Sequence, residues 1–185
     1  MRKVVLSEFL SFDGVAESPT DFILDFDDEV MDEYSEWVLT TQDTVVLGRR
    51  TYDEWAEFWP DSDIEPFASF INTVSKFVVT STPVERSWTN TTVAVGTLKE
   101  FITSLKNQSG GDIGVTGSIT LSQSLLAQGL VDELRLVIAP AIMVNGRKLF
   151  EGTTPSRFEV TRNVTSRTGY LLVDLRLVEA SGPTQ

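Results

Sequence analysis

Histidine and cysteine are both missing from this chain of 185 residues. Histidine is the commonest general base and the commonest ligand of transition metals, while cysteine supplies thiol nucleophiles, disulfides and zinc ligands. Their absence excludes serine–histidine triads, cysteine hydrolases and zinc proteases, and we expect no metal site. A chain without cysteine also fits a cytoplasmic protein, although it is compatible with other compartments.

Long apolar runs are missing as well. No stretch approaches the roughly 18 to 20 apolar residues that cross a bilayer, and the basic start at residues 1–3 leads into a segment broken by Ser7 and Glu8. This pattern argues against a secretory signal and against a membrane partner. With 41% hydrophobic residues, the length suits one well-buried core. We expect a single domain at residues 1–179 and a flexible tail at 180–185.

Positive charge is scarce in the first third of the chain. Residues 1–66 hold 4 Lys/Arg and 18 Asp/Glu, a balance of −14, whereas residues 67–185 hold 11 and 9, a balance of +2. Such a surface repels a phosphate backbone at long range, so we expect no nucleic-acid partner. Most of this acidity fits a solvated helix face. An anionic ligand therefore needs a local pocket rich in basic side chains or amides.

Apolar runs and helical spacing alternate along most of the chain. The apolar runs predict strands at 4–10, 44–47, 76–79, 92–95, 113–116 and 134–139. Helical spacing predicts helices at 27–39, after Gly48, near 66–74, at 98–107 and from 119 to Gly129, with a loop at 15–25. Nearly continuous apolar strands of this kind are typical of a parallel sheet with helices on both faces.

The last third changes character. Two strand-like segments at 158–164 and 170–178 flank a turn at 166–169, which predicts an antiparallel hairpin. The predicted fold class is therefore α/β, a mostly parallel central sheet with helices on both faces and an antiparallel C-terminal hairpin. The hairpin leaves a strand edge that needs cover, which is one reason to expect a homodimer.

Residues 114–126 form an apolar approach, a Gly-Ser turn and a helical pattern. The free amides at the start of a helix carry a partial positive charge, and glycine lets a phosphate approach the backbone closely. Gly117 and Ser118 therefore suit a phosphate. The same arrangement also occurs wherever an α/β chain simply changes direction.

A second strand end repeats this arrangement with basic residues. Gly48 is followed by Arg49, Arg50 and Thr51, and arginine offers paired donors that match phosphate oxygens. The alternative is that both arginines are surface residues that balance the acidic face. The aromatic side chains that follow, from Trp55 onward, either line a pocket or belong to the core.

Three strand ends thus carry residues suited to phosphate, at 48–51, 80–82 and 116–120. Ligands of open α/β sheets collect at the carboxyl ends of the strands, and three such ends favour a long, polyphosphorylated cofactor. The three spaced glycines of ordinary dinucleotide-binding domains are absent after the first strand, and so is a P-loop.

These motifs, in this order, resemble the dihydrofolate reductase-like superfamily and, within it, the group of the riboflavin-biosynthesis reductase (RibD) C-terminal domain. The resemblance runs from about residue 1 to 178 and rests on the motifs at 6–7, 11–14, 46–52, 79–83, 117–134, 140 and 146–150. It implies a three-layer sandwich that binds NADPH. Hydride transfer also suits a chain without histidine, because the cofactor supplies the chemistry.

The resemblance further implies which residues contact NADPH and substrate. The adenosine-side phosphates would meet Arg49, Arg50 and Thr51, with Gly48 also in contact with the cofactor, and the ribose 2′-phosphate region would meet Thr80, Ser81 and Thr82. The pyrophosphate would meet Gly117, Ser118, Ile119 and Thr120, and Thr116 would also contact the cofactor. The segment at 7–14 would pass the nicotinamide, which makes Phe12 and Asp13, together with Trp55, candidates for substrate contacts.

Asp32 is the candidate catalytic acid. Counting back from Gly48 places it where dihydrofolate reductases carry the acid that helps to protonate the pterin, although a helix rich in acids can match this position by coincidence. The proline–tryptophan pattern of folate enzymes is absent from residues 11–25. We therefore expect an NADPH-dependent reductase of the riboflavin reductase-like group that acts on a small heteroaromatic or carbonyl compound. The alternatives are the 5-amino-6-(5-phosphoribosylamino)uracil reductase of riboflavin biosynthesis and a catalytically silent nucleotide-binding protein.

Overall fold

A single sheet of eight strands runs through the computed structural model, which describes residues 1–24 and 29–178. The strand order is β4-β3-β2-β5-β1-β6-β8-β7. The strands are β1 (Val4–Ser11), β2 (Gln42–Gly48), β3 (Ser75–Val79), β4 (Thr91–Val93), β5 (Asp112–Thr116), β6 (Glu133–Ala139), β7 (Phe158–Thr165) and β8 (Leu171–Leu177). Asp27 and Asp28, where we expected the first helix to begin, and the expected tail at 180–185 lie outside the described residues.

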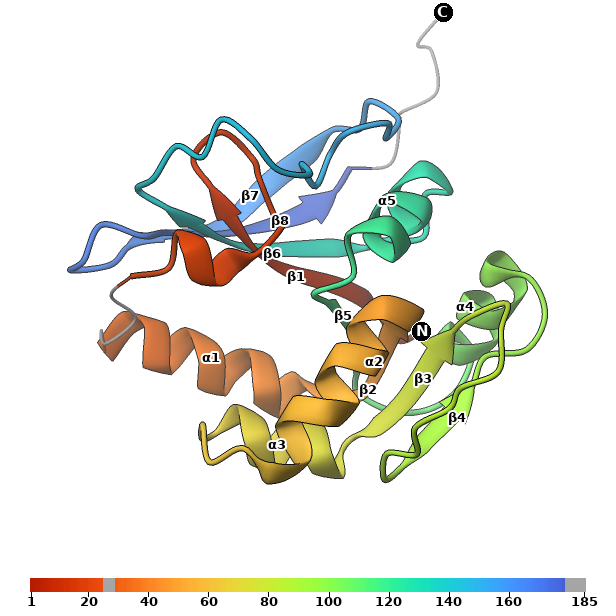
Figure 1. Ribbon diagram of the computed structural model, residues 1–185. Coiled ribbons are helices and arrows are strands. Elements are labelled where there is room, and N and C mark those ends of the chain that lie inside the picture. Colours follow the sequence, from red (N-terminus) through yellow and green to blue (C-terminus); the bar gives the residue numbers. More distant parts are fainter. Residues whose placement is uncertain (25–28, 179–185) are drawn as a thin grey trace, which may run out of the picture.

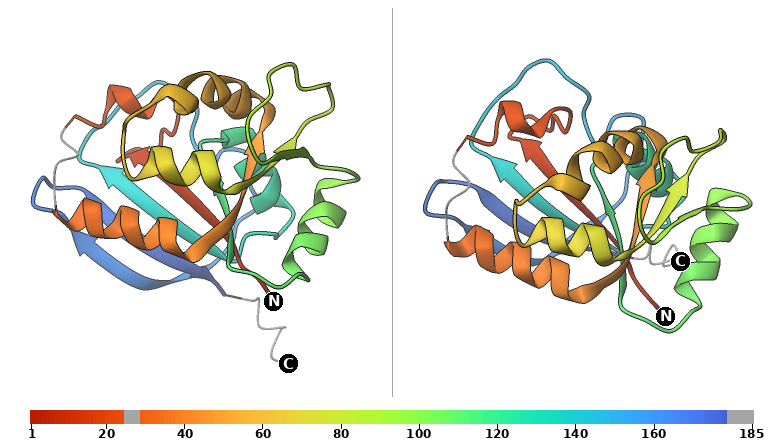
Figure 2. Two further views of the ribbon diagram at one scale, coloured as in Figure 1. Left: turned by 90° about the horizontal axis from the view of Figure 1, so that it is seen from below. Right: turned by 60° about the horizontal axis from the view of Figure 1, so that its bottom comes forward.

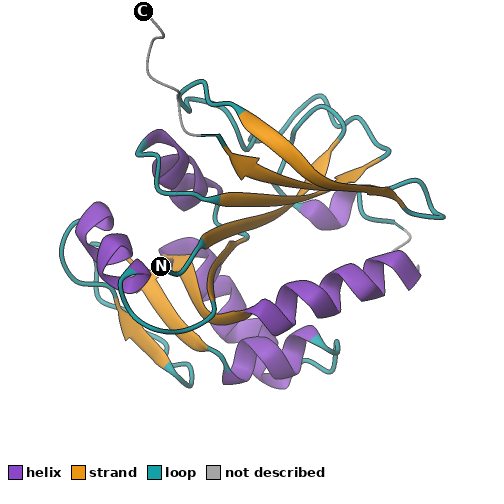
Figure 3. Ribbon diagram, turned by 180° about the vertical axis from the view of Figure 1, so that it is seen from behind, coloured by secondary structure: helices purple, strands orange, loops and turns teal. Residues whose placement is uncertain are grey.

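Helices cover both faces of the sheet (Figures 1 and 2). The α-helices are α1 (Glu29–Thr41), α2 (Arg49–Phe58), α3 (Phe67–Thr73), α4 (Leu98–Lys106) and α5 (Ile119–Ala127). Side chains of α1, α2 and α3 pack on one face, and those of α4 and α5 pack on the other. Seen from behind, the strands run as one continuous layer between the helices (Figure 3). Within the described residues, no helix is long and apolar enough to cross a bilayer.

The direction of the strands follows the predicted pattern. From β4 to β6 all neighbouring strands are parallel, whereas β8 pairs antiparallel with β6 and β7 pairs antiparallel with β8. The predicted α/β class, with its mostly parallel sheet and antiparallel C-terminal hairpin, is therefore confirmed. β1 is central, between β5 and β6, as its apolar character indicated.

Alternation along the strands divides the core between the two faces. On β2, Val46 joins the core under α4 and α5, while its neighbours Val45 and Leu47 join the core under α2 and α3. Successive side chains of a strand point to opposite faces, so a fully buried strand reads as a continuous apolar run. Leu125 of α5 is fully buried in the larger of these cores.

Two of the differences from the predicted elements concern the segments at 15–25 and 92–95. The segment expected to be a loop at 15–25 contains a short 3-10 helix, η1 (Pro19–Asp21), in which proline occupies the first turn, a position that suits its fixed backbone angle. β4 ends at Val93, and Val95 is 84% exposed. Because this edge strand leaves the sheet early, the apolar character of 92–95 overstated its length.

Candidate active site

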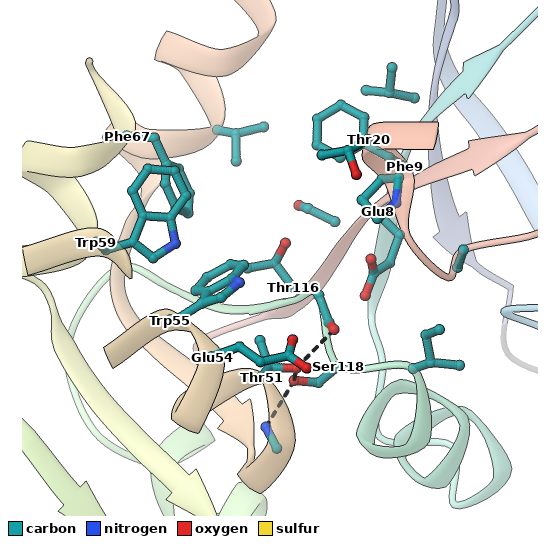
Figure 4. A pocket seen from close by; sticks show the side chains of 18 of the residues that line it. Glu8, Phe9, Thr20, Thr51, Glu54, Trp55, Trp59, Phe67, Thr116 and Ser118 are labelled. Carbon is teal, nitrogen blue, oxygen red and sulfur yellow. Dashed lines mark hydrogen bonds between the residues drawn. The ribbon is translucent and has the colours of Figure 1, made fainter. Parts of the chain in front are cut away.

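A cleft of about 850 Å³ opens where β2 and β5 end and reaches across β1 to α1 and α2 (Figure 4). Its lining combines the turns after these strands with side chains of the helices and of η1. The residues that line it include Ser7, Glu8, Phe9, Glu17, Asp32, Tyr34, Gly48, Arg49, Arg50, Thr51, Glu54, Trp55, Trp59, Phe67, Thr116, Gly117, Ser118, Ile119, Thr120, Arg135 and Arg147. Among the described residues, no group of three acidic side chains is arranged to hold a metal ion.

The turns after β2 and β5 are joined by a chain of hydrogen bonds. The Gly48 amide donates to Ser118 Oγ at 2.9 Å, and Ser118 Oγ donates to Thr51 Oγ1 at 2.8 Å. Thr51 Oγ1 then donates to the Gly117 carbonyl at 2.9 Å. The hydroxyls of Thr51 and Ser118, which we expected at a phosphate, therefore hold the first turn of α2 against the turn before α5.

Gly117 shapes the second of these turns. Its φ of 67° lies in the left-handed region, which glycine adopts without the penalty of a Cβ. A Cβ at this position would meet Trp55 Cζ2 at 3.0 Å and Thr51 Cγ2 at 3.2 Å. The turn thus depends on glycine for its backbone conformation and for its close packing against α2. It directs the chain into α5, whose first amides have no partner within the helix.

The arginines after Gly48 differ in their surroundings. Arg49 Nε donates to Asp53 Oδ2 at 2.7 Å, and its Nη1 donates to Thr82 Oγ1 at 2.8 Å. Arg49 thereby connects the cleft to the segment at 80–82, whose three residues are not part of the lining. Arg50 is exposed and pairs with Glu54 at 2.9 Å.

Two arginines that were not among the predicted site residues also line the cleft. Arg147 Nη2 donates to Thr120 Oγ1 at 2.8 Å, next to the start of α5. Arg135 of β6 is buried, and its guanidinium lies 3.9 Å from the ring centroid of Trp37. The only signal for Arg135 in the sequence is a charge within an otherwise apolar strand.

Aromatic side chains of α2, of α3 and of the short 3-10 helix η2 (Trp59–Asp61) form one wall of the cleft (Figure 4). The ring centroids of Trp55 and Trp59 are 5.9 Å apart, and those of Trp59 and Phe67 are 4.7 Å apart. The rings of Trp55 and Trp59 meet edge to face, an arrangement that aromatic pairs favour. This wall suits a flat, apolar ring.

Glu8 of β1 is the most unusual titratable group of the cleft. Its side chain is 6% exposed, faces α5 and accepts a hydrogen bond from Ser122 Oγ at 3.4 Å, and the backbone of Gly117 and Ser118 also hydrogen-bonds to it. Burial outweighs these hydrogen bonds and raises the pKa of Glu8 to about 8. The sequence motifs missed this residue, because burial and strand register decide its environment.

The candidate catalytic and substrate residues lie in different places. Asp32 is exposed on α1 and lines the cleft, as does Trp55. Phe12 and Asp13 are not part of the lining, and Phe12 is 66% exposed. The carboxylate of Asp13 accepts hydrogen bonds from the amides of Met143 and Val144, which lower its pKa. Asp13 thus holds the turn after β1 to a second loop.

A mostly parallel sheet with these helices and this C-terminal hairpin defines the dihydrofolate reductase-like fold. Dihydrofolate reductase from Enterococcus faecalis, solved with NADP(H), matches the chain with a TM-score of 0.65 at 14% identity, over 95% of this chain and 96% of that chain. The chain belongs to the RibD C-terminal domain family, whose model matches residues 2–172.

The chain is also similar to a curated relative and to further solved structures. YyaP, an uncharacterized protein of Bacillus subtilis (strain 168), is 28% identical over 156 residues, 80% of each chain. A deaminase/5-amino-6-(5-phosphoribosylamino)uracil reductase from Thermotoga maritima matches with a TM-score of 0.67 at 15% identity, over 96% of this chain and 57% of that one. A Shewanella sp. PV-4 structure matches with a TM-score of 0.77 at 19% identity, over 95% and 99%. Reductases thus recur among the structural neighbours.

Proposed function

We propose that this protein is an NADPH-dependent reductase that acts on a small heteroaromatic or carbonyl substrate. The observation that carries the proposal is the cleft itself, in which a glycine turn at the start of a helix, basic side chains and an aromatic wall face one space. Membership of the RibD C-terminal domain family and the reductases among the structural neighbours support it.

The residues of the cleft fit such a cofactor. The Gly117–Ser118 turn and the first amides of α5 offer donors to a diphosphate, and Arg49, Arg50 and Arg147 add positive charge around it. When bound, NADPH supplies the hydride, so the chain needs no nucleophile of its own. Its own side chains bind the phosphates, orient the substrate ring against the aromatic wall and, through Asp32, assist protonation.

Titration with NADPH, followed by nicotinamide fluorescence, tests the proposal first. We expect saturable binding at micromolar cofactor, and its absence would contradict the proposal. Turnover of the riboflavin-pathway pyrimidine, compared with turnover of dihydrofolate, then separates the hypotheses about the substrate. Reduction of the pyrimidine would assign the pathway activity that the T. maritima neighbour is named for, whereas binding without turnover of any heteroaromatic or carbonyl compound tested would favour a silent nucleotide-binding protein.

Charge reversal at Arg49 is expected to weaken NADPH binding by about tenfold or more, since a charge-assisted hydrogen bond contributes roughly 1.5–3 kcal/mol. The Arg49→Glu variant places an acid beside Asp53 and removes the donors to Thr82. The dissociation constant from the fluorescence titration measures the effect.

Arg86→Glu is the matched control. It makes the same change of net charge at an exposed arginine that pairs with Glu57 and does not line the cleft. Its dissociation constant should stay close to that of the unchanged protein. If both variants weaken binding equally, Arg49 acts only through net charge and is not a phosphate ligand.

A further inference from the structure

Glu8 lies beside the Gly117–Ser118 turn, where the proposed function places the diphosphate of the cofactor. β5 ends at Thr116, which is in register with Ser7 of β1. The next residue of β1, Glu8, therefore lies next to the turn that follows β5, and its carboxyl group hydrogen-bonds with the backbone of Gly117 and Ser118. Figure 4 shows this carboxyl group directed toward the Ser118 side of the cleft. Glu8, Gly117 and Ser118 all line the cleft.

No cation among the described residues forms an ion pair with Glu8. α5 packs against it through Ser122, which is uncharged. Arg49 pairs with Asp53, Arg50 with Glu54, and Arg135 with Asp112 and Glu133. Arg147 donates to Thr120, and Glu17 accepts from the Arg147 amide. Asp32 also lines the cleft, from α1. An ionised carboxylate at this position would be buried without an opposite charge, which is costly. Burial accordingly raises the pKa of Glu8 to about 8, so the carboxyl group holds a proton at neutral pH.

We propose that Glu8 and the diphosphate of the cofactor share the backbone groups of the Gly117–Ser118 turn, so that the cofactor binds the form of the protein in which Glu8 carries a proton. This inference rests on the proposed function and deepens it. An ionised Glu8 would hold these donors more strongly than a neutral carboxyl group does, and its charge would repel the diphosphate. A protonated Glu8 carries no charge and so does not repel the diphosphate, and its own O–H can donate a hydrogen bond.

Cofactor binding should therefore weaken as the pH rises into the alkaline range. Below a pH of about 8 the free protein already holds the proton on Glu8, and affinity is constant. Above it, binding must take up one proton from solvent, so the dissociation constant for NADPH should rise by up to about tenfold for each pH unit. The 2′-phosphate of NADPH titrates near pH 6 and does not contribute in this alkaline range.

The test is an NADPH titration between about pH 6.5 and 9.5 on the unchanged protein, Glu8→Gln and Glu17→Gln. Glutamine keeps the shape of residue 8 without its charge, so the Glu8→Gln variant should bind with a nearly constant dissociation constant across this range. Glu17→Gln changes another carboxylate that lines the cleft and should keep the pH dependence of the unchanged protein. Equal profiles for the unchanged protein and Glu8→Gln would overturn the inference while leaving the proposed function intact, whereas a lack of binding at every pH would overturn both.

Unfolding by urea at a series of pH values provides a second readout that needs no cofactor. A carboxyl group whose pKa is raised by folding destabilises the folded state progressively as pH rises from its ordinary value of 4.5 to about 8. Glu8→Gln should therefore gain stability over the unchanged protein through this window, with a constant difference above it. A difference that does not change with pH would overturn the inference, because Glu8 would then be ionised in the folded protein at neutral pH.

Discussion

The Gly117→Ala variant is expected to bind NADPH at least about tenfold more weakly than the unchanged protein. Its Cβ would lie 3.0 Å from Trp55 and 3.2 Å from Thr51, in a backbone conformation with a φ of 67°. A left-handed conformation costs a residue other than glycine roughly 1–2 kcal/mol. The turn must therefore shift, and the amides at the start of α5 move away from the diphosphate. The fluorescence titration measures the loss of affinity, and urea unfolding measures the cost in stability.

Gly129 offers a matched control for this change. Its φ is 64°, almost the same as that of Gly117, but no atom lies within 4 Å of the Cβ position. Gly129→Ala should lose stability through backbone strain alone and keep its affinity for NADPH. If the two alanine variants bind NADPH equally well, the turn at Gly117 is only a connection between β5 and α5.

The Leu125→Ala variant is expected to lose roughly 2–5 kcal/mol of the free energy of unfolding, because a large-to-small change in a packed core leaves a cavity. Leu125 of α5 is fully buried in the core beneath α4 and α5. Urea unfolding, followed by circular dichroism, gives the free energy directly. Because α5 also carries the turn of the cleft, the thermal midpoint of the variant should remain sensitive to NADPH.

Ile142→Ala removes a similar volume of side chain from the surface. Ile142 is 67% exposed, and changes at such positions usually alter the free energy of unfolding by less than about 0.5 kcal/mol. A loss as large as that of Leu125→Ala would show that the loop after β6 is packed more tightly than its exposure indicates.

Most of the fold could be predicted because the local sequence patterns agree with the strands and helices that form. The alternation of apolar runs with helical spacing placed the parallel strands and the C-terminal hairpin, and the central position of β1 followed from its apolar residues. The order of the strands in the sheet could not be derived from these patterns, since periodicity says which face a residue occupies and not which strand lies beside it. The early end of β4 escaped prediction for a related reason, because its edge position is a tertiary feature.

The sequence indicated the parts of the candidate site that are formed by short motifs of neighbouring residues. The residues after Gly48 and the turn at Gly117 line one cleft, together with Trp55 and Asp32. Their proposed roles remain predictions. Thr82 does not line the cleft and is connected to it through Arg49. The hydroxyls of Thr51 and Ser118 hydrogen-bond to each other. Glu8 could not be found from the sequence, because its environment arises from the register between β1 and β5 and from burial under α5.

The hydrogen-bonded chain between the turns has a consequence for engineering the protein. Ser118 accepts from the Gly48 amide and donates to Thr51, which donates to the Gly117 carbonyl. Replacement of either hydroxyl alone removes the buried hydrogen bond between them and leaves the other with only its backbone partner. The effects of changes at the two positions are therefore expected to be coupled. A library meant to alter cofactor preference should therefore diversify positions 51 and 118 as a pair, since screening them one at a time would discard combinations that work only together.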